Sequence, residues 1–177
     1  MRTCSSRLIL AAIAVVWVTA APAQEMTDEQ LIENAVSAAP ESVGNNAAVV
    51  NWEMKTLREG TNGFTCIPDD PATPTDDPMC TDENGMAWMH AIMSKEDPPA
   101  GKVAFAYMLK GGSAASNIDP FATEPAAGSD WIKDGPHVMI MNSPEMMALY
   151  PTGENPDPTQ PYVMFPDTPA HLMIPVP

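Results

Sequence analysis

The six residues His137-Val138-Met139-Ile140-Met141-Asn142 decide the fold class of this chain of 177 residues. Apolar side chains fill four successive positions, 138–141, so a strand built from them is apolar on both faces. Such a strand is typical of the buried middle of a sheet. We therefore expect residues 137–142 to form a central strand, with the rest of the chain supplying its neighbours.

Further strands are predicted before and after this one. Short runs rich in apolar residues, bounded by glycine, proline, asparagine and aspartate, predict strands over residues 49–57, 64–67 and 103–109. Val50, Trp52, Met54 and Thr56 would share one side of the first. The runs at 162–165 and 171–176 flank Pro166-Asp167-Thr168-Pro169 and predict a hairpin.

Three helices complete the prediction. Thr27 can cap a helix that ends before Pro40, residues 84–95 have helical spacing, and a short helix starts at Pro144. Residues 68–78 read as a loop. Residues 113–136 show no period, which in a small domain indicates either a function or a hidden element. The order predicts an α+β fold with a mainly antiparallel sheet, two or three helices and long loops.

The N-terminus has the pattern of a secretory signal peptide. Arg2 and Arg7 give the first residues a positive charge, an apolar run covers residues 8–18, and small residues precede a cut after Ala23. The apolar run is too short to span a membrane, which takes about 20 residues; an uncleaved anchor is the alternative. We expect residues 1–23 to be removed and residues 24–177 to form one domain that works outside the cytosol, in the periplasm or the medium.

The domain that remains is acidic and rich in methionine. The full chain has a net charge of −15, and removing Arg2 and Arg7 lowers it to about −17. Such a chain is repelled by nucleic acid and by anionic lipid, so neither is expected as its main partner. The acidity also has a simple explanation as solubility of an exported protein.

Two cysteines remain once Cys4 leaves with the signal peptide. Cys66 and Cys80 are an even pair in an oxidising compartment, which predicts a disulfide closing a loop of fifteen residues. A free catalytic thiol is the alternative.

Several segments resemble a group of exported bacterial proteins to which no activity is assigned. The segments are Gly60-Thr61-Asn62-Gly63-Phe64-Thr65-Cys66, Asp77-Pro78-Met79-Cys80, Ser116-Asn117-Ile118-Asp119-Pro120 and Gly135-Pro136-His137-Val138-Met139. The resemblance covers most of residues 24–177. It implies a complete domain of its own kind and supplies no catalytic residues.

A metal site of methionine and histidine is the sharpest chemical candidate. Thirteen methionines follow Met1, and thioether sulfur with imidazole suits copper. The candidate ligands are His90, His137, His171, Met86, Met89, Met93 and Met139. Parallel pairing of the two His-x-Met strands would bring His137 and His171 together, whereas antiparallel pairing would separate them. The alternative is that the methionines fill the core and each histidine marks the polar end of a buried strand.

Calcium is the second metal considered. Asp69, Asp70, Asp76, Asp77 and Asp82 lie in or beside the predicted disulfide loop, and calcium prefers such oxygen ligands. Their spacing does not match the EF-hand, and a solvated acidic loop is the preferred explanation.

Enzymatic motifs are not found: the sequence has no Gly-x-Ser-x-Gly elbow and no His-Glu-x-x-His pair. We therefore expect an exported domain that binds a small ligand or a partner protein. A copper-handling protein and a hydrolase without a known motif are the alternatives.

Overall fold

The computed structural model describes residues 26–167 and 169–177, so the predicted signal peptide lies outside the described residues. The helices are α1 (Asp28–Val36), α2 (Glu41–Gly44), α3 (Glu83–Met93) and α4 (Pro144–Met147). The strands are β1 (Ala48–Val50), β2 (Thr56–Arg58), β3 (Phe64–Ile67), β4 (Met79–Asp82), β5 (Ala104–Met108), β6 (Gly112–Ala114), β7 (Ile132–Asp134), β8 (His137–Met141), β9 (Tyr162–Met164) and β10 (His171–Pro175).

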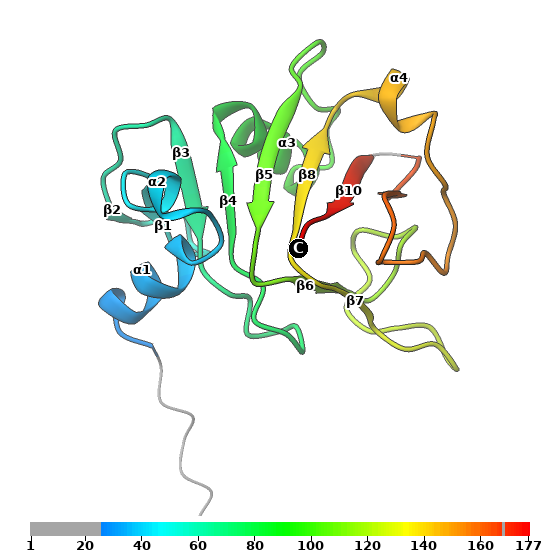
Figure 1. The fold of residues 1–177 in the computed structure, drawn as a ribbon, viewed down its shortest axis with the longest axis horizontal. Helices are drawn as coiled ribbons and strands as arrows, with labels where there is room; N and C mark the ends of the chain where they lie inside the picture. Colours follow the sequence, from blue (N-terminus) through cyan, green and yellow to red (C-terminus); the bar gives the residue numbers. More distant parts are fainter. Residues whose placement is uncertain (1–25, 168) are drawn as a thin grey trace, which may run out of the picture.

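Eight of these strands form one sheet in the order β2-β1-β3-β4-β5-β8-β10-β9 (Figure 1). The pairing of β1 with β3 is parallel, and the other pairs are antiparallel. The predicted α+β fold with a mainly antiparallel sheet is confirmed. Strand β8 lies inside the sheet between β5 and β10, as the apolar pattern of residues 137–142 predicted.

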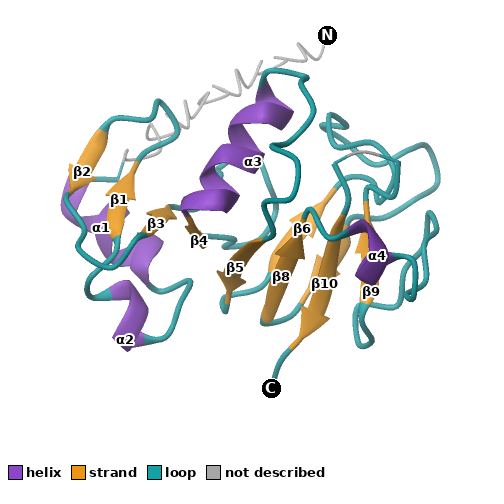
Figure 2. Cartoon of the chain, turned by 90° about the horizontal axis from the view of Figure 1, so that it is seen from above, coloured by secondary structure: helices purple, strands orange, loops and turns teal. Residues whose placement is uncertain are grey.

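Helices α1 and α3 lie on opposite faces of the sheet (Figure 2). Successive residues of β4 show this: the sulfur of Cys80 lies 3.5 Å from the Ala35 carbonyl in α1, while Thr81 abuts Gly85 in α3. Both helices begin where the sequence places a cap. Thr27 and Gln30 form a capping box at α1, and the Asp82 carboxylate accepts the Gly85 amide at 2.8 Å.

Each face of the sheet therefore has its own core. Under α3, Trp88 packs on methionines and alanines of the central strands, among them Ala106, Met139 and Met173. Under α1, Ala35 and Ala38 pack on Val49 and on the two cysteines. No helix among the described residues has both the length and the apolar character to cross a membrane.

The first predicted strand, residues 49–57, is wrong as one unit. It is a hairpin: β1 ends at Val50, residues 51–55 turn, and β2 begins at Thr56. Asn51 causes the turn, because its side chain accepts the Lys55 amide at 2.9 Å and Met54 takes a φ of 61°. Trp52 and Met54 consequently lie in the turn and not on a strand face.

The predicted disulfide is present between β3 and β4. Cys66 and Cys80 are directly opposed in the antiparallel register, and their Cα atoms are 3.9 Å apart. The pair ties the two strands at the base of the 68–78 loop, and both side chains are fully buried.

Replacing both cysteines with alanine is expected to lower the free energy of unfolding by about 3 kcal/mol, because the unfolded chain regains the entropy of a fifteen-residue loop. Guanidinium unfolding of the pair variant and of the wild type, both oxidised, measures the difference. The wild type with its thiols reduced is the matched control, and it should fall by a similar amount. Two free thiols in the native wild type would contradict the expectation.

Candidate functional site

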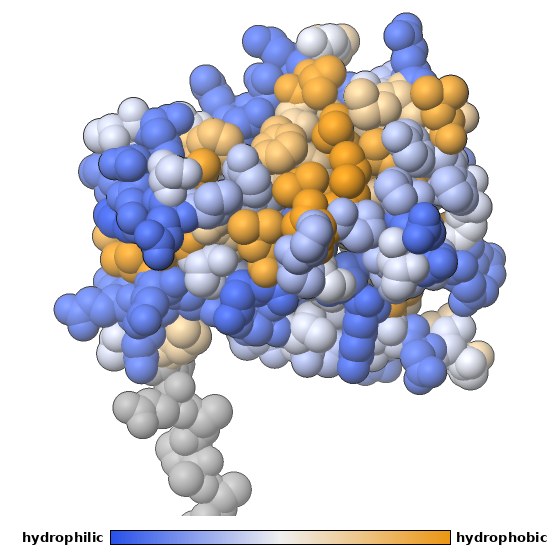
Figure 3. Space-filling model, viewed as in Figure 1, coloured by the Kyte–Doolittle hydropathy of each residue, from blue (hydrophilic) through white to orange (hydrophobic). Residues whose placement is uncertain are grey.

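In the half of the sheet formed by β5, β8 and β10, helix α3 packs on one face, while the other face is only partly covered. Side chains alternate along these strands, and those that point away from α3 are all apolar; Leu172 of β10 is buried with Met147 of α4, and the others are half-buried. The half-buried ones are Phe105, Tyr107, Val138, Ile140 and Ile174, and we call this surface the open sheet face. Figure 3 shows the apolar surface gathered over these strands.

Helices cover the open sheet face only at its margins. Tyr107 contacts the core under α1 at one side, and Met147 of α4 contacts the cluster that includes Ile140 and Ile174 at the other. An antiparallel sheet with a solvated face normally places polar side chains on it. Here both faces are apolar, which is the property that predicted the central position of β8. The open sheet face is thus built like an interior surface.

The three histidines of the predicted metal site lie in different places. Strands β8 and β10 are antiparallel, with His137 opposite Pro175 and His171 opposite Met141, so the two histidines stand at opposite ends of the strand pair. His90 is exposed on α3. The structure therefore does not bring the three together, in line with the antiparallel alternative in which each histidine begins a buried strand.

The predicted methionine ligands are divided in the same way. Met139 is buried beneath α3, Met86 and Met89 are half-buried on that helix, and the side chain of Met93 is 64% exposed. Across residues 26–167 and 169–177, no three His, Cys, Asp or Glu side chains are grouped as a metal site would need.

His171 is held in an aromatic enclosure. Its ring meets Trp88 and Phe165 edge-on, with both centroid separations at 5.4 Å, and its Nδ1 lies 3.4 Å from the Pro169 carbonyl oxygen. Burial lowers the pKa of His171 to about 4, since the charged ring would lose its hydration. The ring is therefore neutral at neutral pH and acts as a packed core group.

The five aspartates considered for calcium make hydrogen bonds within the protein. Asp69 accepts the Asp77 amide at 2.9 Å, Asp70 accepts that of Ala72, and Asp77 accepts the Thr73 hydroxyl at 2.6 Å. Asp76 bonds to Asn34 and lies 3.4 Å from the Lys110 ammonium, and Asp82 caps α3. These carboxylates shape the disulfide loop, and burial raises the pKa of Asp77. Their oxygens do not form a grouped cation site in the described part of the chain.

Residues 113–136 contain an element that the sequence pattern does not reveal. Strands β6 and β7 pair as a separate two-stranded ribbon, with Gly112 opposite Asp134. The loop between them is anchored by Asn117, whose side-chain amide is buried and donates to the carbonyls of Gly153 and Val163. Three-residue strands without alternation are too short for a periodicity argument.

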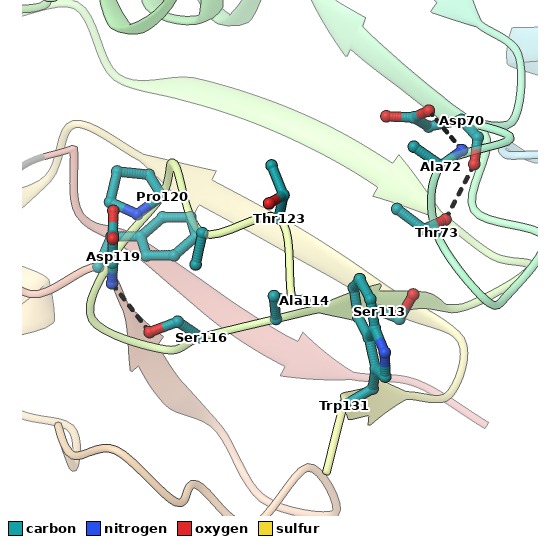
Figure 4. A pocket seen from close by; sticks show the side chains of 13 residues that line it. Asp70, Ala72, Thr73, Ser113, Ala114, Ser116, Asp119, Pro120, Thr123 and Trp131 are labelled. Carbon is teal, nitrogen blue, oxygen red and sulfur yellow. Dashed lines mark hydrogen bonds between the residues drawn. The ribbon is translucent and has the colours of Figure 1, made fainter. Parts of the chain in front are cut away.

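This loop also encloses a pocket of about 280 Å³. Figure 4 shows Trp131 and Ser113 at its centre, with residues 70–73 on one side and the Ser116–Asp119 hydrogen bond on the other. Sites for drug-sized ligands occupy roughly 300–1,000 Å³. The pocket is just below the lower limit of that range.

Comparison of the chain with protein-family models, with curated proteins and with solved structures found no match. Sequence patterns assign these residues to strands and do not by themselves reveal the open sheet face as a site. The signal was nevertheless present in the two-sided apolar pattern of residues 137–142, which demands a cover on each face.

Proposed function

We propose that this protein is an exported binding domain and that it docks a partner protein on the open sheet face. The observation that carries the proposal is the apolar character of a sheet face that α1 and α4 cover only at its margins. Contiguous exposed apolar surface on a folded protein marks an interaction site, because its burial is favourable at roughly 25 cal/mol per Å².

The charge of the chain selects the kind of partner. Two copies with about −17 each would repel as they approach, whereas a protein with basic residues around an apolar patch would be attracted. We therefore infer a basic partner and not a second copy. Aromatic side chains such as Tyr107 and Phe105, whose rings pack edge-on at 4.8 Å, are suited to anchor it.

Export is part of the same proposal. It is supported by the three-part pattern of residues 1–23 and by a buried disulfide of the kind that persists in oxidising compartments. Mass analysis of the protein from the cell envelope and the medium would place the N-terminus at Gln24. A mature protein that begins at Met1 would contradict it.

Site-specific photo-crosslinking in the producing cells tests the docking surface. A crosslinking side chain at Ile140 should join the protein to one other protein of basic isoelectric point, identified by mass spectrometry. The same group at His90, which is exposed on the opposite side of the sheet, is the control and should not capture that protein. A product with twice the mass of this chain would show a second copy instead and would overturn the choice of partner.

The affinity for the purified partner then measures how much this surface contributes to binding. Ile140→Ser should weaken the interaction at least about tenfold, because it removes an apolar anchor from the centre of the face. Ile118→Ser is the matched control, since Ile118 is 46% exposed outside this surface and its change should be neutral. Equal affinity of the wild type and Ile140→Ser would refute the proposed surface.

A further inference from the structure

A row of sulfur and nitrogen donors crosses the sheet beneath the β6–β7 ribbon. Met108 of β5 is directly opposite His137 of β8. Cys80 and Thr81 of β4 are opposite Tyr107 and Ala106, and continuing this register by one residue places Met79 beside Met108. Both methionines pack against the core under α3, so their side chains are on the same face as His137.

The free nitrogen of His137 is prepared to act as a ligand. Nδ1 lies 2.8 Å from the Gly135 carbonyl oxygen, which can only accept, so Nδ1 carries the proton of the neutral ring. Nε2 therefore presents a lone pair, and it is buried without a hydrogen-bond partner in a side chain that is 2% exposed. Metal-binding histidines commonly hold their other ring nitrogen on a backbone carbonyl in this way.

The unpaired nitrogen is unfavourable unless something binds it, because a buried acceptor without a partner loses its hydration and gains no hydrogen bond in return. Packing alone explains the buried methionines but gives no reason for an unpaired nitrogen beside them.

Gly112 leaves room for the side chains of Met108 and His137 to approach each other. A Cβ atom on Gly112 would stand 3.1 Å from the methyl carbon of Met108 and 3.4 Å from Cε1 of His137. Both groups therefore press on the same point of the backbone. Met79 and Met108 also line a mostly apolar pocket of about 190 Å³ that is open to solvent, with Asp77 in its wall, so an ion has a route to the thioethers.

We propose that Nε2 of His137 and the thioether sulfurs of Met108 and Met79 bind one soft monovalent metal ion, Cu(I). Thioether and imidazole ligands suit Cu(I), and three donors with no carboxylate disfavour the harder Ca²⁺, Mg²⁺ and Mn²⁺. Unbranched methionine side chains can turn their sulfurs toward the ion without a change in the backbone. Of the candidate ligands predicted from sequence, only His137 belongs to this set. The set lies on the α3 side of the sheet and uses no residue of the open sheet face.

Competition with a coloured Cu(I) chelator, under ascorbate and without oxygen, tests the site on the whole exported protein. The wild type should take up one Cu(I) per chain. The pair Met79→Leu with Met108→Leu keeps apolar volume but removes both sulfurs, and it should weaken binding at least about tenfold. The pair Met141→Leu with Met164→Leu is the matched control, because both residues are buried in the same core away from the row, and it should change affinity less than twofold.

Nuclear magnetic resonance of ¹³C-methyl methionine in the wild type gives an answer even if a variant fails to fold. Ag(I), which does not change its oxidation state here, should shift the methyl signals of Met79 and Met108. Shifts confined to Met86, Met89 and Met93 would place the ion on α3 and overturn the proposal. Failure to bind either ion, or equal loss in both leucine pairs, would also overturn it.

Discussion

Replacing Gly60 with alanine is expected to destabilise the protein by at least about 4 kcal/mol, enough to leave a large fraction unfolded at 37 °C. A Cβ atom at this position would lie 2.0 Å from the Ala48 nitrogen and 2.6 Å from the Ala47 carbonyl carbon. Both are backbone atoms at the start of β1, so no flexible side chain can yield. The strand would have to leave its place between β2 and β3.

Thermal unfolding followed by circular dichroism measures the effect, and Gly135→Ala is the matched control. Nothing lies within 4 Å of a Cβ on Gly135, so that change should alter the free energy of unfolding by less than about 0.5 kcal/mol. A Gly60→Ala protein with wild-type stability would show that the backbone at the start of β1 does not lie against Gly60.

Acid is expected to destabilise the protein through His171. The pKa of His171 is about 4 in the folded protein and about 6.5 in an unfolded chain, so the unfolded state binds the proton first as pH falls. The contribution is fully present above pH 6.5 and is lost progressively toward pH 4. A difference of this size corresponds to about 3 kcal/mol.

His171→Phe isolates this contribution, because the other titrating groups stay in both proteins. Burial raises the pKa values of Asp77 and Asp134, so these carboxyls oppose the loss in acid, and the lowered pKa of His137 adds to it. Urea unfolding at several pH values from 7 to 4 gives the free energy of each protein. We expect the wild type to lose about 3 kcal/mol more than His171→Phe across this interval. Parallel curves would mean that the folded protein accommodates a charged ring at this position.

The sequence predicted elements wherever local chemistry and tertiary contacts agree. Thr27 and Pro144 mark helix starts, and residues 84–95 have helical spacing. The disulfide follows from the even count of cysteines, and the 162–176 hairpin follows from its turn residues. Prediction from sequence failed for short elements whose few residues depend on distant partners. Strand β4 is four residues long, and Pro78 directly before it made the segment look like the end of a loop.

The two candidate sites were hidden for different physical reasons. The His137–Met108 pairing depends on the register between strands that lie about thirty residues apart, which no local pattern specifies. Tyr162 and Asp134 likewise meet only in the fold, where the phenol donates to the carboxylate at 2.9 Å. The apolar face of β8 was visible in sequence, but its lack of a cover depends on where α1 and α4 pack.

The two edges of the large sheet are short, and this limits how the protein can self-associate. Strands β2 and β9 have three residues each, and the guanidinium of Arg58 in β2 folds back to the carbonyls of Gly44 and Ala47. A short edge offers an incoming strand few free backbone groups, so fibrils that grow by edge pairing are disfavoured. The protein can thus present an apolar sheet face while its short edges resist the addition of further strands.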